Sequence, residues 1–572
     1  MINKITIENF KGIKDRIEID LKPVTLLFGP NSAGKSTVIQ ALHYLKEILE
    51  RYNTDPGKTN QGGEAVDLGG FANLVHRAEG EREDHYKTKS IKIGIEVEED
   101  ELIEPEYFDN KSQFGGAESL LQNAGYDPYY LEFTIEWDNT VGEPILKKYE
   151  VFISGEPIGC IEMAGWNVDD LDDELTIEDV RTSQDIKNRG KKPKFKLTKL
   201  NLKHPALLWT NEQITDQEIP NELLSGVLEN FQDVILDYDD GKTDLSLFYN
   251  YAAFPDFRPV FINQILAHDR GIKDLNDPKV EDDYDPTIDQ ISIELTLSQI
   301  FSTPIIMLRD ILRQFRYIGP LRTIPDREFL PERYPVEGRW SDGLGAWDSI
   351  YRKLIYGFKD NSDFLNRINK WMEQLNTGYN IKIKEYKEVD SENPLMMGLD
   401  PSGRIFEDGD DVRRVFESIP TKNKIILFEE KNQIEVSPKD IGSGVTQVFP
   451  IVVGLADYDA LVLAVEQPEL HVHPAIQQKI ADMVISFKGP NNLIMLETHS
   501  EHIMLRLLRR IEETTENELE KPEYALKHDE VSVVYVVPTE EGVEMTQLPI
   551  DETGEFTRQW PKGFFEERAE DL

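Results

Sequence analysis

Short hydrophobic runs separated by turn-forming pairs open the chain. The first 28 residues contain three such runs, with turn signals at Lys11–Gly12 and Lys22–Pro23, and they predict three short strands. The third run, residues 24–28, leads directly into a glycine-bearing loop. From Lys35 to about Arg51 the apolar positions recur at helical spacing, which predicts an amphipathic helix after that loop.

The next part of the chain has the pattern of extended strands. Residues 90–99, 129–137 and 145–153 are rich in β-branched and aromatic residues and predict an antiparallel β-subdomain. From about residue 156 to 300 the periodicity weakens and acidic clusters interrupt it, which indicates an inserted domain. No heptad pattern is sustained there, so a long coiled coil is not expected.

Regular patterns return in the last 270 residues. Helices are predicted near 303–315, 346–358 and 362–375, and strands near 424–428, 460–465, 492–496 and 531–537. Strands that alternate with helices favour an α/β fold with a mostly parallel sheet covered on both faces. We therefore expect an N-terminal lobe at 1–155, an acidic insertion at 156–300, a C-terminal lobe at 301–530 and a small C-terminal domain at 531–572.

Composition supports a globular, cytoplasmic protein. The chain has 572 residues, of which 39% are hydrophobic and 9% aromatic, enough for several packed units. No apolar run reaches the roughly 18–20 residues of a membrane span, and the first residues lack a signal-peptide core, so no membrane association is expected. Cys160 is the single cysteine, which excludes disulfides within the chain and cysteine-based zinc sites.

The net charge of −44 repels polyanions over most of the surface, so any DNA contact needs a local basic region. The best candidate is Lys187–His204, where eight Lys and Arg residues cluster around Phe195. This segment has two interpretations. It docks DNA or an acidic partner, or its lysines protect the edge of an exposed strand pair.

The stretch "GPNSAGKST", Gly29–Thr37, carries the strongest chemical signal. It fits the phosphate-loop pattern G-x-x-x-x-G-K-[ST], and it follows a predicted strand and precedes a predicted helix, as the motif requires. Backbone N–H groups of such a loop surround phosphates, its lysine reaches the β- and γ-phosphates, and its hydroxyl binds Mg²⁺. The predicted ATP-binding residues here are Asn31, Ser32, Ala33, Gly34, Lys35, Ser36 and Thr37.

Three further features lie in the C-terminal half. Gly442-Ser443-Gly444 begins an apolar helix, and this start offers free N–H groups and a hydroxyl to an anion, although alone it could be an ordinary helix cap. A hydrophobic strand delivers Glu466, and a later strand ends at His499. His471 and His473 form an H-x-H pair, for which a loop role is favoured over zinc binding.

The order of these motifs resembles that of ABC-type ATPases of the SMC and double-strand-break-repair kind. More narrowly it resembles OLD-like ATPases without a TOPRIM domain, found in bacterial anti-phage defence such as Septu- or retron-associated systems. The marks of that group are "IENFKGIK", "YIGPLR", "EQPELHVHP" and "THSEHIMLRLLRR". The segment "IDETGEFTRQWPKGFFEE" resembles a short C-terminal domain of unknown role carried by one branch. The resemblance implies an ABC-type ATPase head with an antiparallel β-subdomain.

The resemblance also implies roles for individual residues. ATP and Mg²⁺ would be sandwiched in a homodimer, with Ser443 and Gly444 of one chain closing on the γ-phosphate held by Lys35 of the other. His499 would bond the γ-phosphate, and Glu466 would hold Mg²⁺ together with Ser36. Gln61 is a weak candidate for the glutamine that such sites place near the metal.

Gln467 occupies the position where the family places its catalytic glutamate. An amide orients water but does not accept its proton, and losing a general base typically costs about 10²–10⁴ in rate. Either Glu469 or Glu466 could substitute as the base, so slow hydrolysis is favoured over none. Since no clustered E…D-x-D pattern follows, a separately encoded effector such as a nuclease is the expected partner. A DNA-maintenance ATPase and a non-hydrolysing scaffold stay open as alternatives.

Overall fold

The computed structural model describes residues 1–98, 128–168, 191–207 and 300–558, with short gaps at 31–32, 52, 59–62, 64, 202, 302, 327–328, 357–361, 400–401, 406–408, 458–460, 490 and 541. Three predicted site residues, Asn31, Ser32 and Gln61, lie outside these ranges. So do most of the predicted insertion and the tail from residue 559 onward.

A six-stranded sheet forms the centre of the molecule, in the order β16-β15-β3-β14-β13-β9. All neighbouring pairs are parallel except β15 and β16. The predicted α/β class with a mostly parallel sheet is therefore confirmed. The strands are β3 (Val24–Phe28), β9 (Phe315–Ile318), β13 (Val462–Glu466), β14 (Leu493–Thr498), β15 (Val531–Thr539) and β16 (Gly542–Gln547).

Helices cover both faces of this sheet, because its central strands are apolar on both sides. All five residues of β3 are buried; Leu27 belongs to one hydrophobic cluster, and Leu26 and Phe28 to the other. Continuous apolar strands of this kind are typical of doubly covered parallel sheets. One face packs against α1 (Ser36–Arg51) and α9 (Thr303–Arg313). The other packs against α11 (Leu344–Tyr351), α12 (Ser362–Gln374), α15 (Ser443–Ala456), α16 (Pro474–Phe487) and α17 (Glu501–Thr515).

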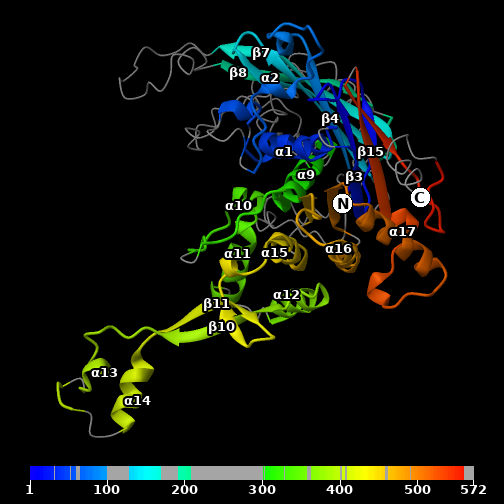
Figure 1. Cartoon of the computed structure of the whole chain (residues 1–572). Coiled ribbons are helices and arrows are strands. Elements are labelled where there is room, and N and C mark those ends of the chain that lie inside the picture. The colour runs from blue at the N-terminus through cyan, green and yellow to red at the C-terminus, as the bar shows by residue number, and fades with distance from the viewer. Residues whose placement is uncertain are drawn as a thin grey trace, which may run out of the picture.

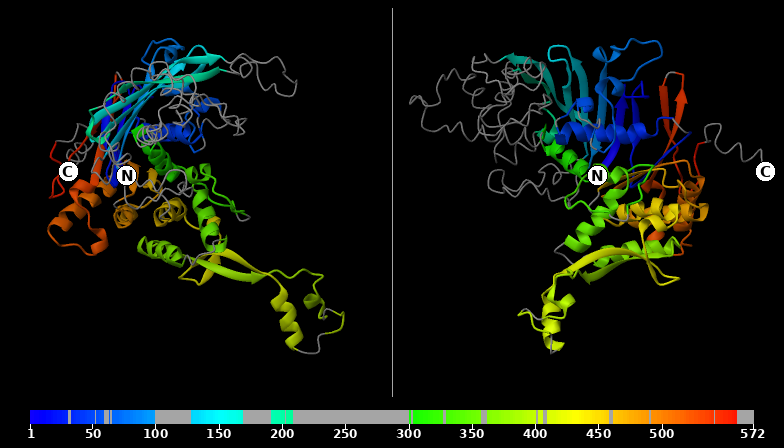
Figure 2. Two further views of the ribbon diagram at one scale, coloured as in Figure 1. Left: turned by 180° about the vertical axis from the view of Figure 1, so that it is seen from behind. Right: turned by 60° about the vertical axis from the view of Figure 1, so that its left-hand side comes forward.

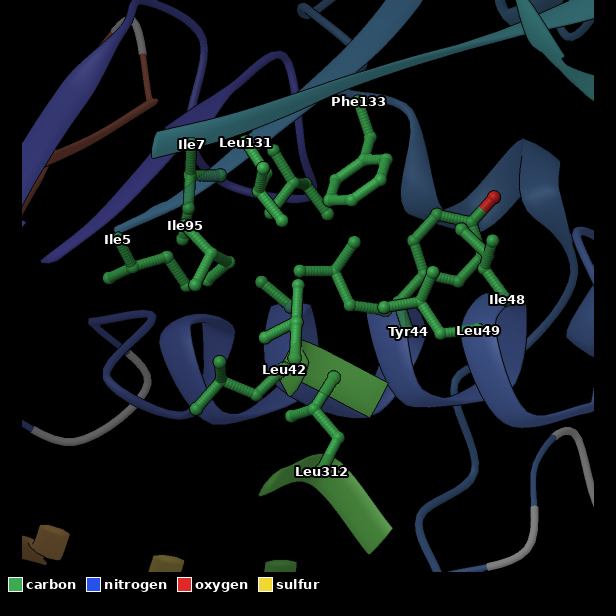
Figure 3. Close-up of a cluster of buried hydrophobic side chains, with 14 of the residues drawn as sticks. Ile5, Ile7, Leu42, Tyr44, Ile48, Leu49, Ile95, Leu131, Phe133 and Leu312 are labelled. Atoms are coloured by element: carbon green, nitrogen blue, oxygen red, sulfur yellow. The ribbon is translucent and has the colours of Figure 1, made fainter. Parts of the chain in front are cut away.

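A second, seven-stranded antiparallel sheet lies over α1 (Figures 1 and 3), in the order β2-β1-β4-β5-β6-β7-β8. Its inward side chains, among them Ile95 and Phe133, meet Leu42 and Tyr44 of the helix. The strands are β1 (Ile2–Glu8), β2 (Ile17–Asp20), β4 (Ser90–Val97), β5 (Tyr129–Asp138), β6 (Glu143–Ile153), β7 (Glu156–Val168) and β8 (Lys191–Leu200).

This sheet continues past the boundary predicted at residue 155. Strand β7 pairs with β6, and β8 pairs with β7 as the edge strand. Residues 156–168 and 191–200 therefore extend the N-terminal sheet instead of opening a separate unit. The acidic and polar residues among them hid the strand pattern, because an antiparallel sheet needs apolar residues on one face only.

The strand near 424–428 exists but does not join the central sheet, contrary to the prediction. It is β11 (Thr421–Glu429), in a three-stranded antiparallel sheet with β10 (Tyr379–Lys387) and β12 (Ile434–Val436). Only Ile425 and Leu427 of β11 are buried, too few for a strand covered on both faces. Strands β10 and β11, with α13 (Pro394–Met397) and α14 (Gly409–Ser418), project from the body as an arm (Figures 1 and 2).

The segment from residue 531 begins inside the central sheet. Strand β15 pairs in parallel with β3 over Val531–Tyr535, so the small domain predicted at 531–572 contributes a strand to the central sheet. Among the residues that the structure describes, no helix combines the length and apolar character needed to span a membrane.

Candidate functional site

Four parallel strands end at one edge of the central sheet, and the predicted site residues gather there. In the register, Phe28 of β3 lies beside Thr498 of β14, and Glu497 of β14 lies beside Glu466 of β13. Strand β9 ends next to β13, with Ile318 beside Val465. Ligands of open α/β sheets bind at this carboxyl edge, because the loops and helix N-termini converge there.

The loop after β3 has the backbone expected of a phosphate loop. Gly34 has φ +91°, a conformation that side-chain-bearing residues rarely adopt. The backbone N–H of Thr37 donates to the Gly34 carbonyl over 3.1 Å as α1 begins. Ala33 and Thr37 are both buried, so the loop turns tightly between strand and helix.

Lys35 is held in place although only 3% of it is exposed. Its Nζ donates to the carbonyl oxygens of Pro30 at 2.8 Å and Gly29 at 3.2 Å, and lies 4.0 Å from the Glu497 carboxylate. Burial lowers the pKa of Lys35, and the nearby carboxylates oppose that shift. The ammonium group is thus desolvated and directed into the loop, where an anion would gain most from it.

Two carboxylates meet the Ser36 hydroxyl at the sheet edge. Ser36 Oγ donates to Glu497 Oε2 over 2.7 Å, and the hydroxyl groups of Tyr317 and Ser36 lie near the Glu466 carboxylate and favour its charged form. Burial raises the pKa of Glu466. Burial, followed by the charge of Glu466, raises the pKa of Glu497 to about 7. Each carboxylate therefore resists ionisation until a cation or donor compensates it.

These groups fit Mg²⁺. A hydroxyl and two carboxylates are hard oxygen donors, the type that Mg²⁺ prefers, and nucleotide phosphates usually complete its coordination. Ser36 and Glu466, predicted as metal ligands, are brought together with Glu497, which the sequence reasoning did not assign.

The two histidines of the H-x-H pair lie away from this edge. His473 caps α16, its ring nitrogen accepting from the Ala475 N–H at 3.2 Å, and His471 is exposed with φ +61°. Among the described residues, no cluster of three or more His, Cys, Asp and Glu side chains suits a metal ion.

Gln467 and Glu469 lie in the loop that follows β13. Gln467 has φ +44°, and its N–H donates to the Glu497 carbonyl over 2.7 Å. Both oxygens of Glu469 are engaged, with Thr498 Oγ1 at 2.7 Å and the His499 N–H at 2.8 Å. Glu469 therefore ties the loop to the end of β14, and it would have to release two bonds to reach a reacting water.

His499 follows β14 immediately, as predicted, and faces the phosphate loop. Burial, then the neighbouring Lys35, lowers its pKa, while a hydrogen bond to the Gly29 backbone opposes the shift. Its Nε2 is buried without a hydrogen-bond partner in the described structure. A buried polar atom without a partner is costly, so this nitrogen is suited to a ligand in the loop.

The helix start at Ser443 lies on the surface. Helix α15 begins there with Gly442 as its N-cap and no side-chain cap bond, and Ser443 is exposed. A Cβ built on Gly444 would lie 3.0 Å from the His471 carbonyl, so the helix start packs closely on the loop after β13. As at any helix N-terminus, the first N–H groups of α15 lack partners within the helix.

Arg322, within "YIGPLR", links this helix to the end of β13. Its guanidinium donates to the carbonyls of Gln447 at 3.2 Å and Glu466 at 2.6 Å, and Gln447 Nε2 donates back to the Arg322 carbonyl at 2.8 Å. Burial lowers the pKa of Arg322 to about 10. The sequence marked this motif but gave it no role. Glu497 was also detectable, because a carboxylate at the end of an apolar strand is the signal that identified Glu466.

The basic segment Lys187–His204 is only partly described. Residues 191–200 form β8, the edge of the antiparallel sheet, and His204 is buried with Nδ1 accepting from the Ala206 N–H. Trp560, Phe564 and Phe565 of the C-terminal motif lie outside the described residues.

Three family comparisons match separate segments. Residues 1–215 match the AAA ATPase domain, residues 317–505 match an AAA domain described as putative AbiEii toxin, type IV TA system, and residues 526–572 match a protein family of unknown function, DUF3696. No curated protein matches the chain. The two AAA matches show an ATPase domain of the AAA type, split into two segments.

Solved SMC heads are similar in outline. They are an SMC head bound to the C-terminal winged-helix domain of ScpA (9% identity, TM-score 0.36, 96% of this chain and 98% of that one), an SMC head bound to the C-terminal domain of ScpA from Pyrococcus furiosus (10%, 0.35, 96% and 96%) and the SMC head from Thermotoga maritima (7%, 0.34, 96% and 99%). At such scores the fold assignment rests on the sheet topology described above.

Proposed function

We propose that this chain, whose two largest segments match AAA ATPase domains, is a slowly hydrolysing ABC-type ATPase that dimerises around ATP. The ATP-closed dimer then controls a separately encoded effector, such as a nuclease, in anti-phage defence. The observation that carries the proposal is the sheet edge at which Lys35, Ser36 and Glu466 converge. Magnesium bound there would neutralise phosphate charge and polarise the γ-phosphate.

The residues of this edge divide the work of binding. Lys35 exchanges its carbonyl partners for the β- and γ-phosphates, and the loop N–H groups surround them. Ser36 and Glu466 hold the cation, and His499 Nε2 gains a partner in the γ-phosphate. Each step replaces a contact of the nucleotide-free chain with a stronger charged one.

Dimerisation is supported by the exposed helix start at Ser443. An anion-binding helix terminus gains most when it meets a charge, and the γ-phosphate of a second chain would supply one. Each ATP would then contact the phosphate loop of one chain and α15 of the other. Nucleotide binding and chain association become one equilibrium.

Slow hydrolysis follows from Gln467. The amide orients water without accepting a proton, so the closed state persists long enough to act as a signal. The same residue favours a second candidate, a scaffold that binds ATP without hydrolysing it. Defence is supported by the motif resemblance and by the AbiEii toxin description of one matched family.

Turnover and mass measurements on the purified chain test this proposal. We expect monomers to associate with MgATP, as measured by light scattering, and to hydrolyse ATP well below about 10 s⁻¹, the ordinary enzyme rate. Gln467→Glu should raise turnover roughly 10- to 100-fold by restoring a base. A wild-type rate above 10 s⁻¹, or a chain that stays monomeric with MgATP, would contradict it.

A further inference from the structure

Glu497 lies among the central residues of the predicted nucleotide site, although no motif assigns it. It is 6% exposed, accepts the Ser36 hydroxyl at 2.7 Å and lies 4.0 Å from Lys35 Nζ. Its backbone carbonyl accepts from the N–H of Gln467, the residue in the usual glutamate position. Glu497 also lies beside Glu466 in the register of adjacent parallel strands.

We propose that Glu497 is the second carboxylate of the magnesium site, supplied by β14 beside Glu466 of β13. This inference rests on the proposed ATPase function and deepens it. The sheet places the two carboxylates side by side, because neighbouring strands lie about 4.8 Å apart and end together. A carboxylate at the end of β14 therefore reaches the same space as one at the end of β13.

Contacts distinguish Glu497 from the other acid nearby. Both oxygens of Glu469 are bonded to the end of β14. Glu497 instead bonds the hydroxyl of a predicted Mg²⁺ ligand, and that bond leaves the lone pairs of the Ser36 oxygen available to a cation. Glu497 is thus directed at the ion position, whereas Glu469 holds the loop.

The carboxylate pair has a consequence for nucleotide binding. Without a cation, ATP phosphates placed beside Glu466 and Glu497 either meet ionised carboxylates or require both carboxyl groups to stay protonated, and a divalent cation removes this cost. Lys35 and Arg322 supply positive charge near this group, but less than the two carboxylates and the ATP phosphates carry together. The site should therefore admit MgATP and reject metal-free ATP, so that cation binding licenses nucleotide binding.

The full-length Glu497→Gln variant tests this, because the amide keeps the shape and removes the charge. ATP affinity is measured by calorimetry over a Mg²⁺ titration and in EDTA. For the wild type we expect at least about a 100-fold loss of affinity in EDTA. For the variant we expect the half-saturating Mg²⁺ concentration to rise about 10-fold or more, and the loss in EDTA to shrink by a similar factor. An unchanged Mg²⁺ dependence would overturn the inference.

Glu501→Gln is the matched control, with the same charge change four residues later in the first turn of α17. Its Mg²⁺ dependence should stay within about 2-fold of the wild type. If Glu497→Gln does not fold, Glu497→Asp keeps the charge on a shorter side chain and should need more Mg²⁺ than the wild type. A wild type that binds ATP equally well in EDTA also overturns the inference. A wild type that ignores MgATP refutes the proposed function itself.

Discussion

The two halves of the proposed ATP site differ in how far one chain completes them. At the phosphate-loop edge, Lys35 and Glu497 are 3% and 6% exposed, and both already have protein partners. At the start of α15, Ser443 is exposed and its helix has no side-chain cap. The first half is organised by the sheet of a single chain, whereas the second is left open to another surface.

The contrast shows where specificity and regulation reside. A preorganised, buried edge binds its ligand without a large ordering cost, so under the proposal each chain would hold MgATP alone. In the proposed dimer, the open helix start would gain its partner only on association, so it would report that two loaded chains have met. Arg322 bonds both Gln447 of α15 and Glu466 of β13, and so connects the two halves within one chain.

Removing Lys35 should break the first half completely. Lys35→Ala deletes the cation aimed at the phosphates, and we expect ATP affinity to fall about 100-fold or more, because charge-assisted bonds in a desolvated site are strong. Calorimetry with MgATP measures this. The control is Lys92→Ala. Lys92 lies on β4, pairs with Glu8 of β1, and its removal should leave ATP binding normal. If both variants bound ATP with equal affinity, Lys35 and its loop would not be part of the ATP site.

Blocking the second half should spare the first. Ser443→Arg places a bulky cation at the exposed helix start, and we expect ATP-dependent dimerisation to weaken roughly 30-fold, about 2 kcal/mol, with single-chain ATP affinity nearly unchanged. Sedimentation with and without MgATP measures the association. Ser418→Arg, at an exposed serine on the arm, controls for added charge. If Ser443→Arg dimerises normally, the open-half interpretation fails.

Weakening the Arg322 link between α15 and β13 should lower turnover more than ATP binding. Arg322→Lys keeps the charge but cannot bond two carbonyls in the same fork geometry. We expect kcat to fall about 10-fold with KM changed less than about 3-fold, because Arg322 positions the end of β13 without touching ATP. Arg339→Lys disturbs a similar pair, with Asp348, away from the sheet edge. The Arg339→Lys variant should lose stability but keep its kcat. If kcat fell equally in both variants, the role of Arg322 would be structural only.

The smallest expected effect is a pH dependence in α1. Burial, with Lys46 nearby, lowers the pKa of His43 to about 3, and its ring packs against Phe315 and Tyr317. An unfolded histidine titrates near 6.5, so the unfolded chain alone takes up this proton below that pH. The contribution of His43 to the free energy of unfolding is complete above pH 6.5 and is lost as pH falls toward 3. At pH 5.5 the loss is about 1.4 kcal/mol.

Denaturant unfolding at pH 8 and 5.5 measures this loss. His43→Phe keeps an aromatic ring in the same packing and has no proton to bind, so it should lose about 1.4 kcal/mol less than the wild type between the two values. Identical losses would mean that His43 does not resist protonation. The result tests whether α1, the helix that follows the phosphate loop, stays packed in the core around His43.

Local patterns were sufficient for the elements of the first half. The apolar run of β3, the helix stripe of α1 and the apolar strands β13 and β14 were predicted close to their observed bounds. Burial on both faces explains this, since it leaves a strong signal in consecutive residues. The mixed strands β7 and β8 and the arm strand β11 carry a weaker signal, and the prediction misplaced them.

Sequence alone determined that this chain has a phosphate-loop motif, a Gly-Ser-Gly helix start and a strand-borne carboxylate, because each depends on residues a few positions apart. Only the tertiary structure decided which of them share a space. Glu497 lies 461 residues from Ser36, yet the strand order β3-β14-β13 places its carboxylate against that hydroxyl. Arg322 reaches Gln447 and Glu466 for the same reason: parallel strands that are distant in the sequence end together at one edge.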